Sequence, residues 1–216
     1  FYDCTSLCEI SLPPLLQSIE KNCFAGCSKL TSIIIPSSVK IICECAFNRC
    51  TSITTISIPS SVTEIAPRAF DGCSSIVHLE IPSSVTSIGK FAFYKCSNLE
   101  QIIIHSNIPS IGDCTFDRCS KLKQISIPPS VKMIGNSAFS ECSSLEEISL
   151  PSSVTKIGVF AFSGCKSLKQ ASIPSPLEHI GGHIFKGCSS LTKLTISSSI
   201  NLNSLDINSN VLVTKI

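Results

Sequence analysis

Apolar and polar positions recur along this chain at a constant interval. A phenylalanine opens each unit, at Phe1, Phe24, Phe47, Phe70, Phe93, Phe116, Phe139, Phe162 and Phe185, so that the period is 24 − 1 = 23. A cysteine follows three residues later, at Cys4, Cys27, Cys50, Cys73, Cys96, Cys119, Cys142, Cys165 and Cys188. No insertion or deletion breaks this register. Such strict periodicity predicts a solenoid, in which each unit stacks on its neighbours and buries a shared core.

With the phenylalanine counted as position 1, the unit reads F-x-x-C-S-x-L-x-x-I-x-I-P-x-S-V-x-x-I-G-x-x-A. The I-x-I step has the alternation of a half-buried strand, and its β-branched residues suit a pleated surface. A proline at position 13 should end that strand, because it lacks an amide donor (Pro36, Pro59, Pro82, Pro128, Pro151, Pro174). Strands of successive coils should pair in parallel.

The rest of the unit predicts shorter elements. The S-V-x-x-I-G stretch reads as a second short strand or extended segment. We expect its glycine to adopt a turn conformation (Gly89, Gly112, Gly135, Gly158, Gly181). The A-F-x-x-C-S stretch is either one helical turn or an irregular bend, since a unit this short leaves no room for a long helix.

The segment L-x-x-I-x-I-P matches the strand signature of leucine-rich repeats. The remainder, S-V-x-x-I-G-x-x-A-F-x-x-C, departs from the common forms and resembles the BspA-like leucine-rich repeat, seen clearly in residues 78–101. The resemblance covers about residues 1–200. It implies a surface protein of bacteria or protists that adheres to host cells, extracellular matrix or other microbes. It brings no catalytic motif and no binding residues.

The predicted fold is therefore mainly β: a leucine-rich-repeat solenoid of about nine coils with short parallel strands, forming a curved rod on the order of 45 Å long. Residues 1–196 form the solenoid, with units starting at 1, 24, 47, 70, 93, 116, 139, 162 and 185. After Leu191 the strand pattern returns early, as Leu202, Leu205 and Ile207. Residues 197–216 are either a shortened terminal coil that caps the stack or a degenerate repeat.

The chain has 14 cysteines, nine of them at position 4. These should stack as buried, reduced thiols that fill the corner after the phenylalanine and hydrogen-bond a neighbouring turn. Parallel Cβ vectors would hold neighbouring Cβ atoms about 4.8 Å apart, which is too far for a disulfide. The other five are Cys8, Cys23, Cys43, Cys45 and Cys114. Cys43 and Cys45 near Cys23 are the best metal candidates, but their C-x-C spacing is a poor zinc signal, and a disulfide among these five is the stronger alternative.

The outward side chains of the I-x-I strand are at positions 9 and 11. They vary while the core stays constant, as expected of a scaffold that displays a binding surface. Neutral drift on a solvated face would give the same variation. The candidate ligand-binding face consists of Ile34, His78, Glu80, Gln101, Ile103, Gln124, Glu147, Gln170 and Lys193.

Composition argues against several other functions. The net charge is +2, with 43% hydrophobic and 15% charged residues. His179 and His183 have metal-helix spacing, but Gly181 and Gly182 between them oppose a helix. No catalytic constellation or phosphate-binding loop is evident, so we expect neither an enzyme nor a cofactor. A loose basic edge gives only a weak nucleic-acid signal (Arg49, Arg68, Lys90, Lys95, Arg118, Lys186).

Two functional hypotheses follow. The first is a cell-surface or secreted adhesion and recognition module that binds a protein ligand, including a glycoprotein or matrix protein. The second is an intracellular interaction scaffold. It is favoured by the expected reduced cysteines and by the lack of any N-x-S/T sequence. We expect no nucleic-acid partner and no membrane insertion by this segment, and we expect self-association through uncapped solenoid ends.

Overall fold

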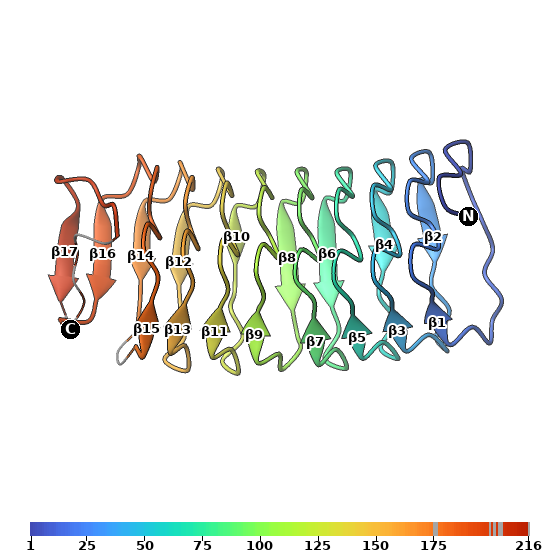
Figure 1. Ribbon diagram of the computed structural model, residues 1–216, viewed down its shortest axis with the longest axis horizontal. Helices are drawn as coiled ribbons and strands as arrows, with labels where there is room; N and C mark the ends of the chain where they lie inside the picture. The colour runs from blue at the N-terminus through green and yellow to red at the C-terminus, as the bar shows by residue number, and fades with distance from the viewer. Residues whose placement is uncertain (175–176, 199, 201, 203–204, 216) are drawn as a thin grey trace.

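The computed structural model describes residues 1–174, 177–198, 200, 202 and 205–215. Two rows of short parallel strands run along the stack of coils, whose termini lie at opposite ends (Figure 1). The first row holds β2 (Ser32–Ile34), β4 (Thr55–Ser57), β6 (His78–Ile81), β8 (Gln101–Ile104), β10 (Gln124–Ile125), β12 (Glu147–Ser149), β14 (Gln170–Ser172), β16 (Lys193–Ile196) and β17 (Leu212–Lys215). The second row holds β1 (Ser18–Ile19), β3 (Ile41–Ile42), β5 (Glu64–Ile65), β7 (Ser87–Ile88), β9 (Ser110–Ile111), β11 (Met133–Ile134), β13 (Lys156–Ile157) and β15 (His179–Ile180).

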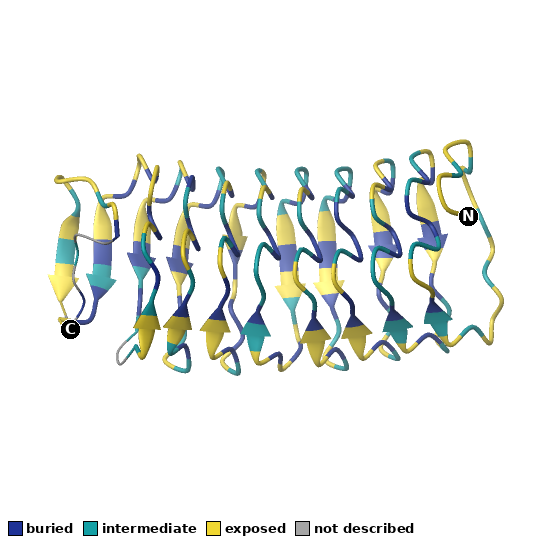
Figure 2. Cartoon of the chain, viewed as in Figure 1, coloured by how far each residue is buried: buried dark blue, intermediate teal, exposed yellow. Residues whose placement is uncertain are grey.

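Both predicted strands are confirmed. The first row falls on positions 9–12 and stops before the position-13 proline, while the second row falls on positions 18–19. Where neighbouring strands of a row pair, from β2 to β16, the offset equals the sequence period, as in Ile33 with Ile56 and Ile134 with Ile157. Within the described residues the first row is unpaired between β4 and β6 and between β10 and β12. Along the first row, exposed and buried residues alternate, so one side of each strand faces the core and the other faces solvent (Figure 2).

The bend between coils is made of turns rather than a helical turn. Residues 44–49 are all in turns, and their amides reach forward to the next coil: Cys45 N donates to Pro67 O, and Phe47 N donates to Ala69 O at 2.8 Å. The backbone ladder therefore continues around this corner without regular secondary structure, which satisfies the amides of a segment that is largely buried.

The core is a ladder of phenylalanine rings. Neighbouring rings from Phe1 to Phe185 stack with centroids 5.3–5.9 Å apart and interplanar angles of 4–19°. From Phe24 onward these rings are fully buried, whereas Phe1 is 58% exposed. Isoleucine, leucine and valine from positions 7, 10, 12, 16 and 19 pack around the ladder.

The position-4 cysteines form a second ladder beside the rings. From Cys27 to Cys188, each thiol donates to the carbonyl oxygen of the phenylalanine that opens the preceding coil, at Sγ–O distances of 3.0–3.3 Å. These eight cysteines are buried, so the predicted role as a corner filler that bonds a neighbouring turn is confirmed. The thiol is a second donor to a carbonyl that already accepts a backbone amide within its own bend, as Phe47 O accepts from Cys50 N at 3.1 Å.

The glycine at position 20 does not adopt the predicted turn conformation. None of the five has a positive φ, and Gly89 lies between β7 and the following turn. In four of them glycine is required because the preceding coil leaves no room for a side chain. A Cβ on Gly158 would lie 2.5 Å from Asn136 N, and a Cβ on Gly89, Gly135 or Gly181 would be similarly close to the preceding coil. The left-handed conformation occurs instead at positions 3 and 22, where most residues are not glycine, as at Arg49, Lys95 and Arg118.

One coil interrupts the second row. The backbone amide at position 17 donates to the position-17 carbonyl oxygen of the preceding coil, as it does from Lys40, Thr63, Lys132 and Thr155. Pro109 occupies position 17 of its coil and has no amide hydrogen to donate. Within the described residues, β9 forms no pairing with β7, and the sheet of this row ends there and restarts. The first row continues through the same junction, because β6 pairs with β8 along four residues.

The terminal segment adds one shorter coil. Lys193 of β16 pairs with Leu212 of β17, so the offset is 212 − 193 = 19, whereas Ile33 and Ile56 are offset by 56 − 33 = 23. Residues 205–206 lie in a turn, and the buried Leu205 accepts a hydrogen bond from the amide of Phe185. All three residues of the predicted strand pattern, Leu202, Leu205 and Ile207, lie outside β17, so the strand follows the pattern rather than coinciding with it.

Candidate functional site

The predicted ligand-binding face lies on the solvent side of the first strand row. All nine of its residues are exposed: Ile34, His78, Glu80, Gln101, Ile103, Gln124, Glu147, Gln170 and Lys193. Parallel pairing without a register shift brings position 9 of successive coils side by side, as in the series of Glu147, Gln170 and Lys193. Residues that are one period apart in sequence therefore form a continuous file across the sheet.

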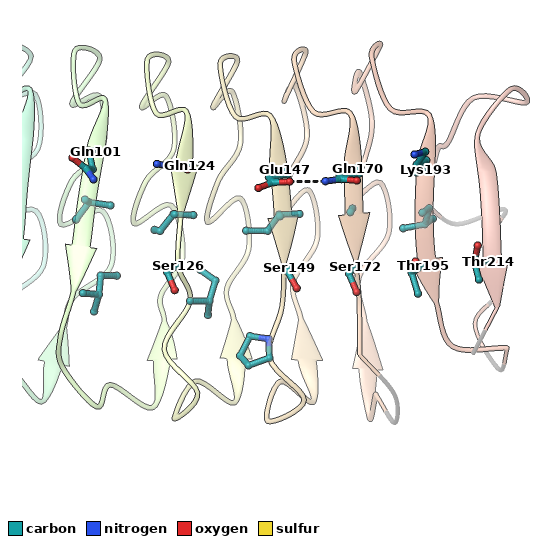
Figure 3. Close-up of a pocket in the computed structure, with 18 of the residues that line it drawn as sticks. Gln101, Gln124, Ser126, Glu147, Ser149, Gln170, Ser172, Lys193, Thr195 and Thr214 are labelled. Carbon is teal, nitrogen blue, oxygen red and sulfur yellow. Dashed lines mark hydrogen bonds between the residues drawn. The ribbon is translucent and has the colours of Figure 1, made fainter.

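Six of the nine line an open groove of about 1010 Å³ that crosses β8, β10, β12, β14, β16 and β17 (Gln101, Ile103, Gln124, Glu147, Gln170, Lys193). Figure 3 shows two files of polar side chains in it. One file carries the amides and charges of position 9. The other carries the hydroxyls of position 11 and its equivalent in β17 (Ser126, Ser149, Ser172, Thr195, Thr214).

The groove is rich in hydrogen-bonding groups and nearly balanced in charge. Gln170 Nε2 donates to Glu147 Oε2 at 2.5 Å across neighbouring coils (Figure 3). Glu147 and Lys193 contribute one charge of each sign. Apolar surface remains at Ile103, which is 37% exposed, and at Leu212, which is 65% exposed. This combination suits a partner surface that is itself mostly neutral.

The other three predicted residues lie outside this groove. Ile34 and His78 border a small depression over β2 and β4, and His78 and Glu80 border another over β4 and β6. Ile34 is 85% exposed, so it is a surface residue rather than the edge of the core. His105 Nε2 lies 4.0 Å from Glu80 Oε2, which places a titratable pair beside the second depression.

Sequence reasoning missed the contribution of β17, including Leu212 and Thr214. The available signal was the short run of apolar and β-branched residues Val211, Leu212, Val213 and Thr214, which is typical of a strand.

The cysteines outside position 4 do not form a metal site in the described residues. Cys8 is exposed, and Cys23, Cys43, Cys45 and Cys114 are half-buried. All 14 cysteines carry free thiols. Across the described ranges, no group of three or more His, Cys, Asp or Glu side chains is arranged to hold a metal ion. For the four half-buried cysteines, burial raises the thiol pKa, which makes them poorer ligands and nucleophiles.

The predicted basic edge is only partly assembled. Four of its members, Arg49, Arg68, Lys95 and Arg118, border one groove along the bends, and they are joined there by Lys166. Lys90 lies elsewhere and forms an ion pair with Asp113. The part of the chain that the structure describes contains no helix long and apolar enough to cross a lipid bilayer.

Comparison with known proteins identifies the repeat. The sequence profile of the family described as BspA type leucine rich repeat region matches residues 1–123 and 86–211, with six copies of the repeat. A search of curated protein sequences finds no match.

Solved structures share the coil geometry. A T. pallidum leucine-rich repeat protein is 32% identical over 76% of this chain and 68% of its own, with a TM-score of 0.61. A leucine-rich repeat protein from Eubacterium ventriosum is 26% identical over 85% of this chain, with a TM-score of 0.71, and the match spans about half (48%) of that protein. One from Bacteroides ovatus shares the fold over 100% of this chain and 85% of its own at 23% identity, with a TM-score of 0.54.

Proposed function

Because this chain belongs to the BspA-type leucine-rich repeat family, we propose that it is a non-catalytic binding solenoid that serves as an adhesion or recognition module at the cell surface or outside the cell. The observation that carries the proposal is the groove across β8 to β17. It combines a buried apolar file at position 10 with outward side chains that are varied and exposed at position 9 and mostly hydroxyl-bearing at position 11.

A protein surface is the ligand that this groove suits best. It is open and extends over six neighbouring strands, so it offers a broad contact area rather than an enclosed pocket. Amide and hydroxyl groups supply donors and acceptors, while Ile103 and Leu212 supply apolar contacts at its margins. Extended sheet surfaces of solenoids are used in this way. A glycoprotein or matrix protein satisfies these requirements.

The alternative is an intracellular interaction scaffold. The free thiols favour it, because disulfides form readily outside cells and 14 cysteines would be exposed to that chemistry. The eight buried thiols are protected by the core, however, so they are compatible with either compartment. Protease shaving of intact source cells, followed by immunodetection of this chain, separates the two locations. Full protection until lysis would rule out the surface role.

The binding face is tested with a pair of matched double variants. Gln124→Arg with Ser149→Arg places two bulky charges in the middle of the groove. Thr63→Arg with Thr86→Arg places the same two charges at exposed sites beside the second strand row. Against an array of purified matrix proteins and cell-surface glycoproteins, the groove variant should lose about tenfold or more in affinity, while the control binds like the parent. Equal binding by both variants would show that this face is not the contact surface.

A further inference from the structure

A second groove, of about 1110 Å³, follows the bends of the central coils on a different edge from the strand face. Its side chains come mainly from positions 2, 3, 5 and 22 of consecutive coils. Five cations line it: Arg49, Arg68, Lys95, Arg118 and Lys166. Because coils are about 5 Å apart, these cations are spread along a line rather than gathered at one point.

Positive charge is concentrated in this groove. The lining holds five cations and two carboxylates, Asp71 and Glu141, so its formal charge is 5 − 2 = +3, against +2 for the whole chain. Asp117 precedes Arg118 in the same bend and offsets part of this charge, and burial raises the pKa of its carboxyl group. Even with Asp117 included, the groove accounts for the net charge of the molecule.

Four of these cations lack an ion-pair partner among the described residues. Arg68 is the exception, since it donates to Asp71 at 2.8 Å and lies 4.2 Å over the ring of Phe91. In the described ranges, no carboxylate lies within ion-pair distance of the other four, which are all exposed (Arg49, Lys95, Arg118, Lys166).

Outside the groove the lysines fall into two groups. Five face a carboxylate of the neighbouring coil, four of them at Nζ–O distances of 2.6–2.8 Å and Lys156 at 3.4 Å (Lys21–Glu44, Lys90–Asp113, Lys123–Glu100, Lys169–Glu146, Lys156–Glu178). The others have no ion pair among the described residues (Lys29, Lys40, Lys121, Lys132, Lys186, Lys193, Lys215). At position 3 the neighbouring coils present Lys95 beside Arg118, and like charges facing each other across paired segments are unfavourable. Asp71 attracts Lys95 and Arg49, and Asp117 attracts Arg118 and Lys95, so this repulsion is partly offset within the folded chain.

Backbone conformation points the same way. Position 3 has a positive φ in every coil, and four coils place glycine there (Gly26, Gly72, Gly164, Gly187). In the groove it is occupied by Arg49, Gly72, Lys95, Arg118 and Glu141, and the three cations have φ of 57°, 57° and 64°. Long side chains are disfavoured in this region, and such strain clusters at functional sites. Three of these five coils thus place a cation at a position where glycine would be unstrained.

Hydroxyl groups in the groove indicate the class of ligand. Thr51, Ser120 and Ser143 each donate to a carbonyl of the preceding coil, at 3.2–3.3 Å. With their protons engaged, these oxygens present lone pairs to the groove and can accept hydrogen bonds. The groove therefore offers cations for anionic groups and acceptors for hydroxyl donors along the same line. A chain of sugars that carries acidic groups has both.

The aromatic content argues against single-stranded nucleic acid. Tyr94 is the aromatic side chain in the lining, and its ring is engaged by Lys95 Nζ at 5.0 Å and Arg118 Cζ at 6.0 Å from the centroid. Grooves that bind single strands without sequence preference rely on several free aromatic faces for base stacking.

We propose that this groove binds a linear polysaccharide bearing sulfate or carboxylate groups, held by Arg49, Lys95, Arg118 and Lys166. The site and its ligand differ from the strand face and its protein partner, so each interaction can be lost without the other.

The test uses a size-defined heparin oligosaccharide, with binding measured by calorimetry at low and at physiological ionic strength. Lys95→Gly with Arg118→Gly removes two central cations and introduces the residue that other coils use at position 3. Lys40→Thr with Lys132→Thr removes two exposed lysines at position 17, where other coils carry threonine. Both variants lower the formal net charge equally, from +2 to 2 − 2 = 0.

The groove variant should bind heparin about tenfold more weakly or worse, and it should resist heat at least as well as the parent. The control should bind within about twofold of the parent. Binding by the parent should weaken as salt rises. The proposal is overturned if both variants lose affinity equally, or if the parent fails to bind heparin at low salt. It is also overturned if a single-stranded oligonucleotide or polyglutamate of equal charge competes as well as heparin.

Discussion

The ladder of buried thiols should make the solenoid unstable at alkaline pH. Burial raises the pKa of Cys50 to about 12 and that of Cys73, Cys96, Cys119 and Cys142 well above the ordinary value of 9.0. For Cys165, the hydrogen bond with the Cys188 thiol and then burial raise the pKa. Six thiols therefore hold their protons in the folded state at pH values where an unfolded chain releases them.

The sign of the effect follows from this difference. Below about pH 9 the thiols are protonated in both states, and the folded state keeps its full stability. As the pH rises through 9 toward the folded pKa values, only the unfolded state ionises and is stabilised. Each thiol then costs about 0.4 kcal/mol at pH 9 and about 1.4 kcal/mol at pH 10. Six thiols lower the free energy of unfolding by about 2–3 kcal/mol at pH 9 and about 8 kcal/mol at pH 10.

Urea unfolding followed by circular dichroism, under reducing and oxygen-free conditions, measures this dependence between about pH 7 and pH 10. The double variant Cys119→Ala with Cys142→Ala is the matched control, because it removes two of the six thiols and should reduce the alkaline loss by about a third. A parent protein whose stability stays constant to pH 10 would refute the reasoning. A variant that loses stability as steeply as the parent would assign the loss to other groups.

Two further substitutions test the packing, each by urea unfolding against a matched control. Phe93→Ala should cost about 3–5 kcal/mol, because it opens a cavity between Phe70 and Phe116, whose rings stack on it at 5.5 Å. Phe1→Ala, at a site that is 58% exposed, should cost less than about 1 kcal/mol, and equal losses would contradict a continuous ring ladder. Gly158→Ala should cost about 1–3 kcal/mol, since its Cβ would lie 2.5 Å from Asn136 N. Gly112→Ala, whose nearest neighbour is at 3.4 Å, should be nearly neutral, and a similar cost at both sites would show that contact with the preceding coil is not what requires glycine.

Much of the fold could be predicted because the sequence repeats with a strict period. Apolar residues at fixed positions specified both strand rows, and the position-13 proline marked where the first strand ends. The turn conformation predicted for the glycine at position 20 was wrong. Glycine is required there because neighbouring coils approach closely, and a contact between residues one full period apart leaves no signal in the local sequence. The left-handed conformation at position 3 was hidden, because Arg49, Lys95 and Arg118 are not residues that usually mark it.

The candidate site was predictable in outline only. Alternation along the strand showed which side chains face outward, and the exposure of Gln124 and Gln170 agrees with that. Whether outward residues form a groove depends on how the sheet is shaped and where it ends, and β17 was not recognised. The basic groove draws Arg49 and Lys166 together with residues from the coils between them, and only the stacking geometry shows which scattered cations share one edge.

Strand pairing opens at three junctions between coils in the described structure. The second row is open between β7 and β9, at Pro109, and the first row is open between β4 and β6 and between β10 and β12. Nearest-neighbour coupling holds a repeat stack together, so cooperativity should be weakest at the junctions that lose one row. At the Pro109 junction the bend and the first strand row remain bonded. A pulling force or a rising denaturant concentration should therefore separate the coils at these junctions first, so that the molecule yields in more than one step. The same open edges are where the rod can flex.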